Sequence, residues 1–245
     1  MVYACGLRPT WDACHNATLT LKAGNAPQTT ALATQLLVQV GRMSLKVLAL
    51  NCSLKSKDES SSTDRLLKEV LEELASHGAE GEVVRAAAFD IKPGVTADEG
   101  DGDEWPGLLR QILACDILVL GTPIWLGQPS SVAKRVLERM DAFFGEPDDS
   151  KRLPPFGKVA VVAVVGNEDG AHHVCAELYQ ALNDVGFTIP ASGGTYWVGE
   201  AMGKINYQDL AKTPEKVAAN TQMVASNAAH LAQILKRSRY PGVAS

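Results

Sequence analysis

A polar segment between residues 51 and 64 has the composition of an anion-binding loop. It reads NCSLKSKDESSSTD and carries five serines, one threonine and two lysines. Hydroxyl groups, backbone N–H groups and the positive end of a helix dipole together favour an anion, and a phosphate monoester suits a loop so rich in hydroxyls. The residues predicted to bind it are Ser53, Lys55, Ser61, Ser62 and Thr63. The simpler interpretation is an ordinary loop in which Ser62 or Thr63 caps the following helix.

Two further loops follow apolar runs. The first, residues 121–131, reads GTPIWLGQPSS, and the second, residues 166–173, reads GNEDGAHH. Neither they nor the polar segment contains GxGxxG or GxxxxGK[ST], so an ordinary dinucleotide site and a P-loop are not expected. Continuous apolar runs are typical of parallel strands covered on both faces, and such sheets bind ligands at the carboxyl ends of their strands. The three loops are therefore the places where function is expected.

Three other features have a chemical interpretation and a simpler one. Cys52, beside a helix N-terminus, could be a reactive thiolate, but a small packing residue is the more frequent case. The pair His172 and His173 could bind a metal, yet adjacent helical residues do not face each other. The acidic run over residues 98–104 lacks the spacing of a calcium loop, so a solvated loop is expected. The sequence thus predicts no metal site and no catalytic side chain.

Composition limits the partners of the chain. Of its 245 residues, 46% are hydrophobic and 21% are charged, and the formal net charge is −5. These values are typical of a globular protein and argue against nucleic acid as a partner. No run of 18 apolar residues predicts a membrane span. Five cysteines without a CxxC pair favour a reducing compartment, so a cytoplasmic location is expected.

Strands and helices are predicted to alternate from residue 45 onward. The expected strands are Leu45–Asn51, Glu82–Phe89, Asp116–Gly121, Lys158–Val165 and Gly194–Val198. The expected helices are Thr63–His77, Trp105–Ala114, Pro129–Phe144, Ala171–Val185 and Pro214–Arg237. Alternating strands and helices predict an α/β fold, a doubly wound five-stranded parallel sheet with helices on both faces.

Residues 1–42 differ from the rest of the chain. They hold three basic residues and one acidic residue, and their pattern predicts no strand and only a short helix over 31–40. At Met43 the pattern changes abruptly into the first strand. We therefore expect residues 1–42 to be an N-terminal extension, disordered or upstream of the true start, and residues 43–245 to be the folded domain.

The loop sequences resemble those of a known family. GTPIWLGQPSSVAKRVLERMD looks like the corresponding segment of the flavodoxin-like NAD(P)H-dependent FMN reductases and quinone reductases. The segment at 51–64 resembles their GSxRxxS.T phosphate loop, with Ser53 at the first serine and Ser62–Thr63 at the closing pair. Cys52 and Lys55 stand where many members have Gly and Arg. The resemblance covers about residues 45–190 and implies a flavodoxin-like sheet with strand order 2-1-3-4-5.

The resemblance also implies an FMN site formed by all three loops. In the family, the loop after the third strand lies along the flavin ring, where its backbone can bond the polar edge and its side chains can form apolar walls. The loop after the fourth strand often carries paired glycines that let backbone approach the ring. Besides the residues of the phosphate loop, the FMN-binding residues implied here are Thr122, Pro123, Ile124, Trp125, Leu126, Gly127, Gly166, Asn167 and Gly170.

The function that follows is an FMN-dependent oxidoreductase. It would take hydride from NADPH or NADH and pass electrons to a quinone, flavin or similar small acceptor, with the cofactor supplying the chemistry. One alternative is a flavodoxin-like electron-transfer protein without a nicotinamide site, and another is a binding protein of this fold without flavin. Family members usually complete the cleft by association, so a homodimer or homotetramer is expected, with the helix at 129–144 and the pair Tyr196–Trp197 as candidate surfaces.

Overall fold

Five parallel strands form the central sheet of the computed structural model, which describes residues 43–56 and 58–243. The strands are β1 (Leu45–Asn51), β2 (Ala79–Arg85), β3 (Ile117–Trp125), β5 (Val159–Gly166) and β6 (Gly194–Val198). Their order in the sheet is β2-β1-β3-β5-β6. This order confirms the predicted one, 2-1-3-4-5. A two-residue strand, β4 (Gln128–Pro129), pairs antiparallel with the end of β3 and makes a hairpin there.

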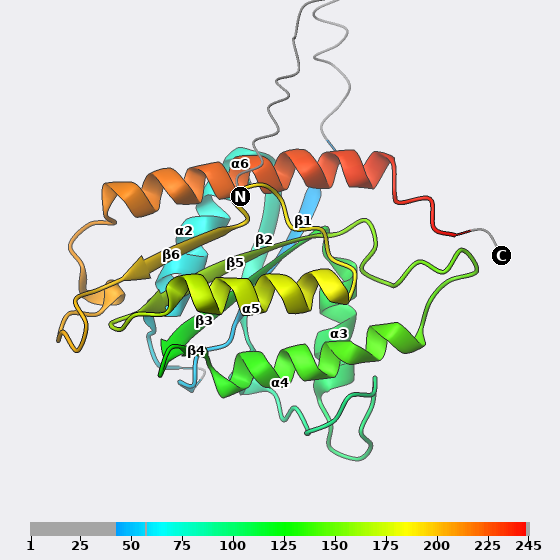
Figure 1. The fold of residues 1–245 in the computed structure, drawn as a ribbon, viewed down its shortest axis with the longest axis horizontal. Helices are drawn as coiled ribbons and strands as arrows, with labels where there is room; N and C mark the ends of the chain where they lie inside the picture. The colour runs from blue at the N-terminus through cyan, green and yellow to red at the C-terminus, as the bar shows by residue number, and fades with distance from the viewer. Residues whose placement is uncertain (1–42, 57, 244–245) are drawn as a thin grey trace, which may run out of the picture. The chain divides into compact units, whose positions relative to one another are not determined.

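Helices cover both faces of the sheet, as predicted (Figure 1). Helices α2 (Ser62–Ser76) and α6 (Glu215–Arg237) pack on one face. Helices α3 (Trp105–Ala114), α4 (Ser131–Met140) and α5 (Ala171–Asp184) pack on the other. Because side chains alternate along a strand, a strand buried on both faces must be apolar throughout. In β1, Leu48 and Leu50 face α3–α5, whereas Val47 and Ala49 face α2 and α6.

Some predicted element ends are wrong, for identifiable reasons. The second strand ends at Arg85 instead of Phe89, because Ala86–Ala88 turn into a short 3-10 helix. The helix expected over 129–144 is α-helical only from Ser131 to Met140, since Pro129 pairs in β4 and a 3-10 helix follows over Asp141–Gly145. The third strand extends past Gly121 to Trp125, where the hairpin begins. The boundary at Met43 and the helix at 31–40 concern residues outside the described ones and stay predictions.

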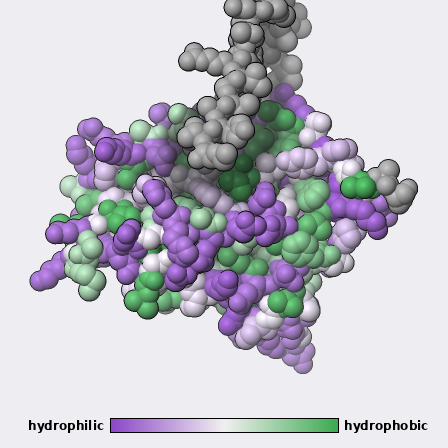
Figure 2. Space-filling view, in the orientation of Figure 1, coloured by the Kyte–Doolittle hydropathy of each residue, from purple (hydrophilic) through white to green (hydrophobic). Residues whose placement is uncertain are grey.

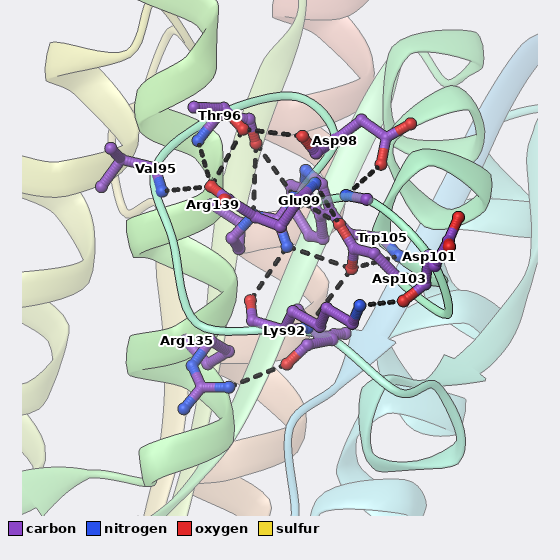
Figure 3. A network of polar contacts seen from close by, with 12 residues as sticks. Lys92, Val95, Thr96, Asp98, Glu99, Asp101, Asp103, Trp105, Arg135 and Arg139 are labelled. Carbon is purple, nitrogen blue, oxygen red and sulfur yellow. Dashed lines mark hydrogen bonds and ion pairs between the residues drawn. The ribbon is translucent and has the colours of Figure 1, made fainter.

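The expectation of a solvated acidic loop is wrong at Asp103. The side chains of Asp103 and Arg139 are both fully buried and form an ion pair with Nη2–Oδ2 at 2.7 Å. Figure 3 shows Arg139 of α4 reaching into the loop, where it also donates to the carbonyl oxygens of Lys92 and Thr96. The loop is therefore bound to α4 through one buried arginine.

The surface of the described residues combines polar and apolar side chains. On the face that Figure 2 shows, hydrophilic residues (purple) are interspersed with hydrophobic ones (green). Within this described part of the chain, no helix has the length and apolar character needed to cross a membrane.

Candidate functional site

A cavity of about 440 Å³ lies at the carboxyl ends of β1, β3, β5 and β6, where the fold is expected to bind a ligand. Ten of the predicted site residues line it: Ser53, Lys55, Ser61, Ser62, Thr63, Pro123, Ile124, Trp125, Gly166 and Asn167. Eight further residues line it that the sequence did not indicate: Leu54, Val165, Glu168, Trp197, Met202, Gly203, Asn206 and Gln208. The three loops therefore meet at one site, joined by a segment from beyond β6.

The polar loop after β1 is held in shape by its own first residue. The side-chain oxygen of Asn51 accepts a hydrogen bond from the Ser53 N–H at 2.9 Å, and its amide nitrogen lies 3.4 Å from Ser61 Oγ. Asn51 itself is fully buried at the end of β1. Lys55 Nζ donates to the carbonyl oxygen of Ser60 at 2.7 Å, which closes the loop across its tip. The two ends of the loop are thereby fixed relative to each other.

Arg85, at the end of β2, supports the same loop from outside the cavity. Its Nη1 donates to the carbonyl oxygens of Ser56 and Glu59, and its Nη2 lies 3.5 Å from Asp64 Oδ1. The arginine thus binds backbone oxygens of the loop and none of its serine hydroxyls. It also offsets the negative charge of Asp64, which would otherwise disfavour an anion near the first turn of α2.

The N-terminus of α2 opens onto the cavity. Its N-cap is Ser61, whose Oγ accepts from the Asp64 N–H at 3.0 Å, so the expectation that Ser62 or Thr63 is the cap is wrong. The N–H groups of the next two residues, Ser62 and Thr63, belong to the first turn and have no acceptor within the helix. Two free N–H groups and a helix dipole at a hydroxyl-rich loop form a site for an anion.

Buried polar atoms without hydrogen-bond partners indicate whether the site fits a phosphorylated ligand. Among the described residues, four buried side-chain polar atoms lack a hydrogen-bond partner, and three of them belong to the cavity lining. They are Ser53 Oγ, Glu168 Oε1 and Gln208 Oε1; the fourth is Trp105 Nε1. Buried polar groups are almost always bonded, so three exceptions in one cavity indicate partners supplied by a ligand. The Ser53 hydroxyl, which can donate, fits a phosphate oxygen.

The loop after β3 is a hairpin whose tip points away from the cavity. Pro123, Ile124 and Trp125 line the cavity, but Leu126 is 91% exposed and, with Gly127, forms the turn at φ of 53° and 73°. Neither residue of the turn lines the cavity. Their predicted contact with FMN therefore stays a prediction.

Two other predicted residues have structural roles beside the cavity. Thr122 is fully buried, and its Oγ1 accepts from the Ser130 N–H at 3.0 Å, which fixes the start of α4. Gly170 caps α5 at a φ of 121°, and a Cβ there would lie 2.8 Å from the Cα of Gly127. Glycine at 170 therefore lets the hairpin pack against α5. Neither residue lines the cavity.

The segment between β6 and α6 forms the wall that the sequence did not predict. Asn167 binds it through its side chain, whose Nδ2 donates to Gly203 O and Asn206 Oδ1 at 3.3 and 3.2 Å. The backbone oxygen of Asn167 accepts from the Met202 N–H at 2.9 Å. Gln208 approaches the phosphate loop, with its N–H 3.3 Å from Ser62 Oγ. No local pattern marks these residues, because their role depends on contacts with loops far away in the sequence.

An arginine on α2 fastens this wall to the rest of the domain. Arg65 Nη1 donates to the carbonyl oxygens of Tyr207 and Leu210 at 2.9 and 2.7 Å, and its guanidinium lies 4.9 Å from the centre of the Tyr207 ring. The Tyr207 hydroxyl donates to Glu69, which also pairs with Arg65. The Tyr207 ring packs against Trp197 of β6, with centroids 5.4 Å apart. Trp197 is thus half-buried and lines the cavity, while Tyr196 beside it is exposed; the prediction that this pair forms an association surface stays a prediction.

The remaining chemical candidates are a buried cysteine and two exposed histidines, each of which contacts a neighbouring side chain or packs in the core. Burial raises the pKa of the Cys52 thiol far above its usual value, so Cys52 is a packing residue and no reactive thiolate. His172 Nε2 lies 2.9 Å from the hydroxyl of Tyr196, and His173 Nε2 lies 2.9 Å from Glu177. The two histidines therefore have separate partners.

Comparison with known proteins gives one family. Residues 45–203 match the family model described as NADPH-dependent FMN reductase. A Streptomyces davaonensis protein described as 8-demethyl-8-aminoriboflavin-5′-phosphate synthase is 34% identical over 209 residues, which cover 81% of this chain and 81% of that protein. A Mycobacterium bovis protein described as divalent metal cation transporter MntH is 36% identical over 199 residues, or 78% of this chain, but this chain spans only 29% of its length.

Solved structures agree with this assignment. RosB with the bound intermediate 8-demethyl-8-formylriboflavin-5′-phosphate superposes with a TM-score of 0.73 at 32% identity, covering 80% of this chain and 82% of that one. A structure described as flavone reductase has a TM-score of 0.56 at 16% identity, covers 80% of this chain and 66% of its own, and shows the fold alone. The family match ends at Gly203, so Asn206 and Gln208 of the cavity lie beyond it.

Proposed function

This chain belongs to the NADPH-dependent FMN reductase family, and from that premise we propose that it is an NAD(P)H-dependent oxidoreductase with FMN in the described cavity. It passes electrons to a quinone, a flavin or a similar small acceptor. The observation that carries the proposal is the unpartnered, buried hydroxyl of Ser53 in a loop that ends at the N-terminus of α2. That combination suits the phosphate of FMN.

Different parts of the cavity bind different parts of the cofactor. The hydroxyls of Ser53 and Thr63, with the N–H groups that open α2, hold the phosphate. Pro123, Ile124 and Trp125 provide apolar surface that keeps water from the ring. When bound, FMN supplies the hydride-accepting and electron-donating chemistry, so the protein needs only to bind, orient and shield it.

Anaerobic reduction tests this proposal directly. We expect NADPH or NADH to bleach the oxidised flavin of the FMN-loaded protein, and an acceptor panel to restore its colour. A flavin that dithionite reduces but neither nicotinamide does would favour the alternative of an electron-transfer protein. Failure to bind FMN at all would favour a binding protein without flavin.

A second candidate rests on the relatives. The Streptomyces protein is described as a synthase acting on a flavin 5′-phosphate, and RosB holds such a molecule as an intermediate. The same cavity of this chain would then bind the flavin phosphate as substrate. Mass spectrometry of the flavin recovered after aerobic incubation with an amine donor separates the two: unchanged FMN favours the reductase, and a ring whose methyl group has been oxidised or replaced by an amino group favours the synthase.

We further propose that the active protein is a homodimer or larger. Exposed apolar side chains flank the cavity: Trp125 is 54%, Met202 is 91% and Ile205 is 63% exposed. Because apolar and aromatic side chains gather at interface cores, a second copy seated there would cover them and wall the nicotinamide site. Sedimentation should show a dimer or tetramer. A monomer with full NAD(P)H oxidation activity at nanomolar concentration would contradict this.

A further inference from the structure

Glu168 lines the cavity and has a carboxylate oxygen without a hydrogen-bond partner. The residue follows β5, and the atom without a partner is its buried Oε1. Within the described residues, Glu168 takes part in none of the ion pairs. A buried polar atom without a hydrogen-bond partner is unfavourable, so this oxygen is a candidate for interaction with a bound molecule.

The neighbours of Glu168 show that the loop does not require this charge for its own structure. Asn167 binds the segment beyond β6 through Gly203 and Asn206. Asp169 Oδ1 accepts from the Gly170 N–H at 2.7 Å. Of the three consecutive polar side chains, Glu168 alone has a buried side-chain oxygen without a hydrogen-bond partner, and the residue lines the cavity.

The sheet order places Glu168 away from the phosphate loop. Strand β5 is separated from β1 by β3 alone, so the ends of β1 and β5 lie about 10 Å apart, which is two strand spacings. In the proposed complex, with the phosphate held at the end of β1, we place the ring system farther along the same cavity, where Gly166, Asn167 and Glu168 line it.

We propose that Glu168 sets the reduction potential of the bound flavin, an inference that rests on the proposed function. Reduction by a hydride equivalent adds two electrons and one proton, and it leaves the ring with one negative charge. A carboxylate facing the same cavity repels that charge and so disfavours the reduced form relative to the oxidised one. Glu168 thereby makes the reduced protein a stronger electron donor and widens the range of acceptors it can reduce.

The test compares two charge-removing substitutions in one loop. Glu168→Gln keeps the shape of the side chain and removes its charge, whereas Asp169→Asn removes a charge one residue away that does not line the cavity. For each protein, the affinities for oxidised and for reduced FMN are measured anaerobically, together with the midpoint potential against a reference dye. Glu168→Ala serves as a second variant, because it removes the charge without offering a new amide donor.

The expected result is specific to position 168. Relative to oxidised FMN, Glu168→Gln should bind reduced FMN at least about tenfold more tightly than the wild type, a rise of about 30 mV for a two-electron couple. Glu168→Ala should shift in the same direction, and Asp169→Asn should match the wild type. An unchanged potential in both Glu168 variants, with oxidised FMN still bound, would overturn the inference and leave the proposed function standing.

Two other outcomes have distinct meanings. If the potential is unchanged but inhibition by NADP⁺ or NAD⁺ weakens in Glu168→Gln, the carboxylate serves the cationic nicotinamide instead, and the inference is wrong. If the wild-type protein does not bind FMN, the proposed function fails, and the inference fails with it.

Discussion

Two polar clusters in this domain differ in how completely their buried polar atoms are bonded. In the acidic-loop cluster, formed by Lys92, Thr96, Asp103 and Arg139, both oxygens of Asp103 and all three guanidinium nitrogens of Arg139 have partners (Figure 3). In the cavity cluster, formed by Ser53, Glu168 and Gln208, each residue has a buried oxygen without one.

The difference distinguishes stability from binding. A network that satisfies itself needs no ligand and holds the fold together, while one that leaves polar atoms buried and unpartnered is completed by something else. Substitutions in the acidic-loop cluster should therefore change folding with little effect on FMN, and substitutions in the cavity cluster should do the reverse.

The largest effect is expected for Asp103→Ala. It leaves the guanidinium of Arg139 buried without its carboxylate, which costs about 3–5 kcal/mol of unfolding free energy. Urea unfolding monitored by circular dichroism measures the loss. Under conditions where the variant is folded, its Kd for FMN should stay within about threefold of the wild type, since the two clusters share no residues. An Asp103→Ala variant with the unfolding free energy of the wild type but without FMN binding would contradict this distinction between stability and binding.

The same ion pair should make stability depend on pH. Hydrogen bonds from Arg139, and from the N–H groups of Glu99, Trp105 and Lys92, hold the pKa of Asp103 well below its usual range. The unfolded chain, with a pKa of about 3.9, takes up the proton first, so this contribution is complete above about pH 5 and is lost as the pH falls through and below about pH 4. Unfolding free energies measured down this range should fall less steeply in Asp103→Asn. Equal slopes would contradict the assignment.

In the cavity cluster we expect a smaller effect, and we expect it on FMN affinity instead of on the free energy of unfolding. The double variant Ser53→Ala, Thr63→Ala should bind FMN at least about tenfold more weakly, because charge-assisted hydrogen bonds contribute about 1.5–3 kcal/mol. Its unfolding free energy without FMN should fall far less than that of Asp103→Ala, since the Ser53 hydroxyl has no partner to lose and Thr63 loses only its hydroxyl and one methyl group. Unchanged FMN affinity would end the assignment of these hydroxyls to the phosphate.

The smallest effect is expected when the chain begins at Met43. Met43 exchanges hydrogen bonds with the side chain of Gln233 on α6, so the anchoring of β1 is retained in the shortened protein. Its melting temperature and its Kd for FMN should match those of the full chain. Precipitation or loss of flavin would show that residues 1–42 contribute to the fold.

The sequence predicts the sheet well because each strand is marked by a pattern within its own few residues. Runs such as 117–121 are apolar throughout, which identifies buried parallel strands, and the loops that follow them must meet at one edge. The burial of Asp103, in contrast, depends on Arg139, which lies 36 residues further along the chain. No local pattern predicts that pair. The same holds for Asn206 and Gln208, which reach the cavity only because Asn167 and Arg65 bind their segment.

Titration of the flavin-free protein with FMN and with riboflavin tests the central claim most directly. The two ligands differ only in the 5′-phosphate, for which the loop of Ser53 and the first turn of α2 are the assigned site. We predict that FMN binds at least about tenfold more tightly than riboflavin, and that this preference is reduced in Ser53→Ala, Thr63→Ala, which keeps the N–H groups and the helix dipole. Equal affinity of the wild-type protein for both ligands would contradict the account.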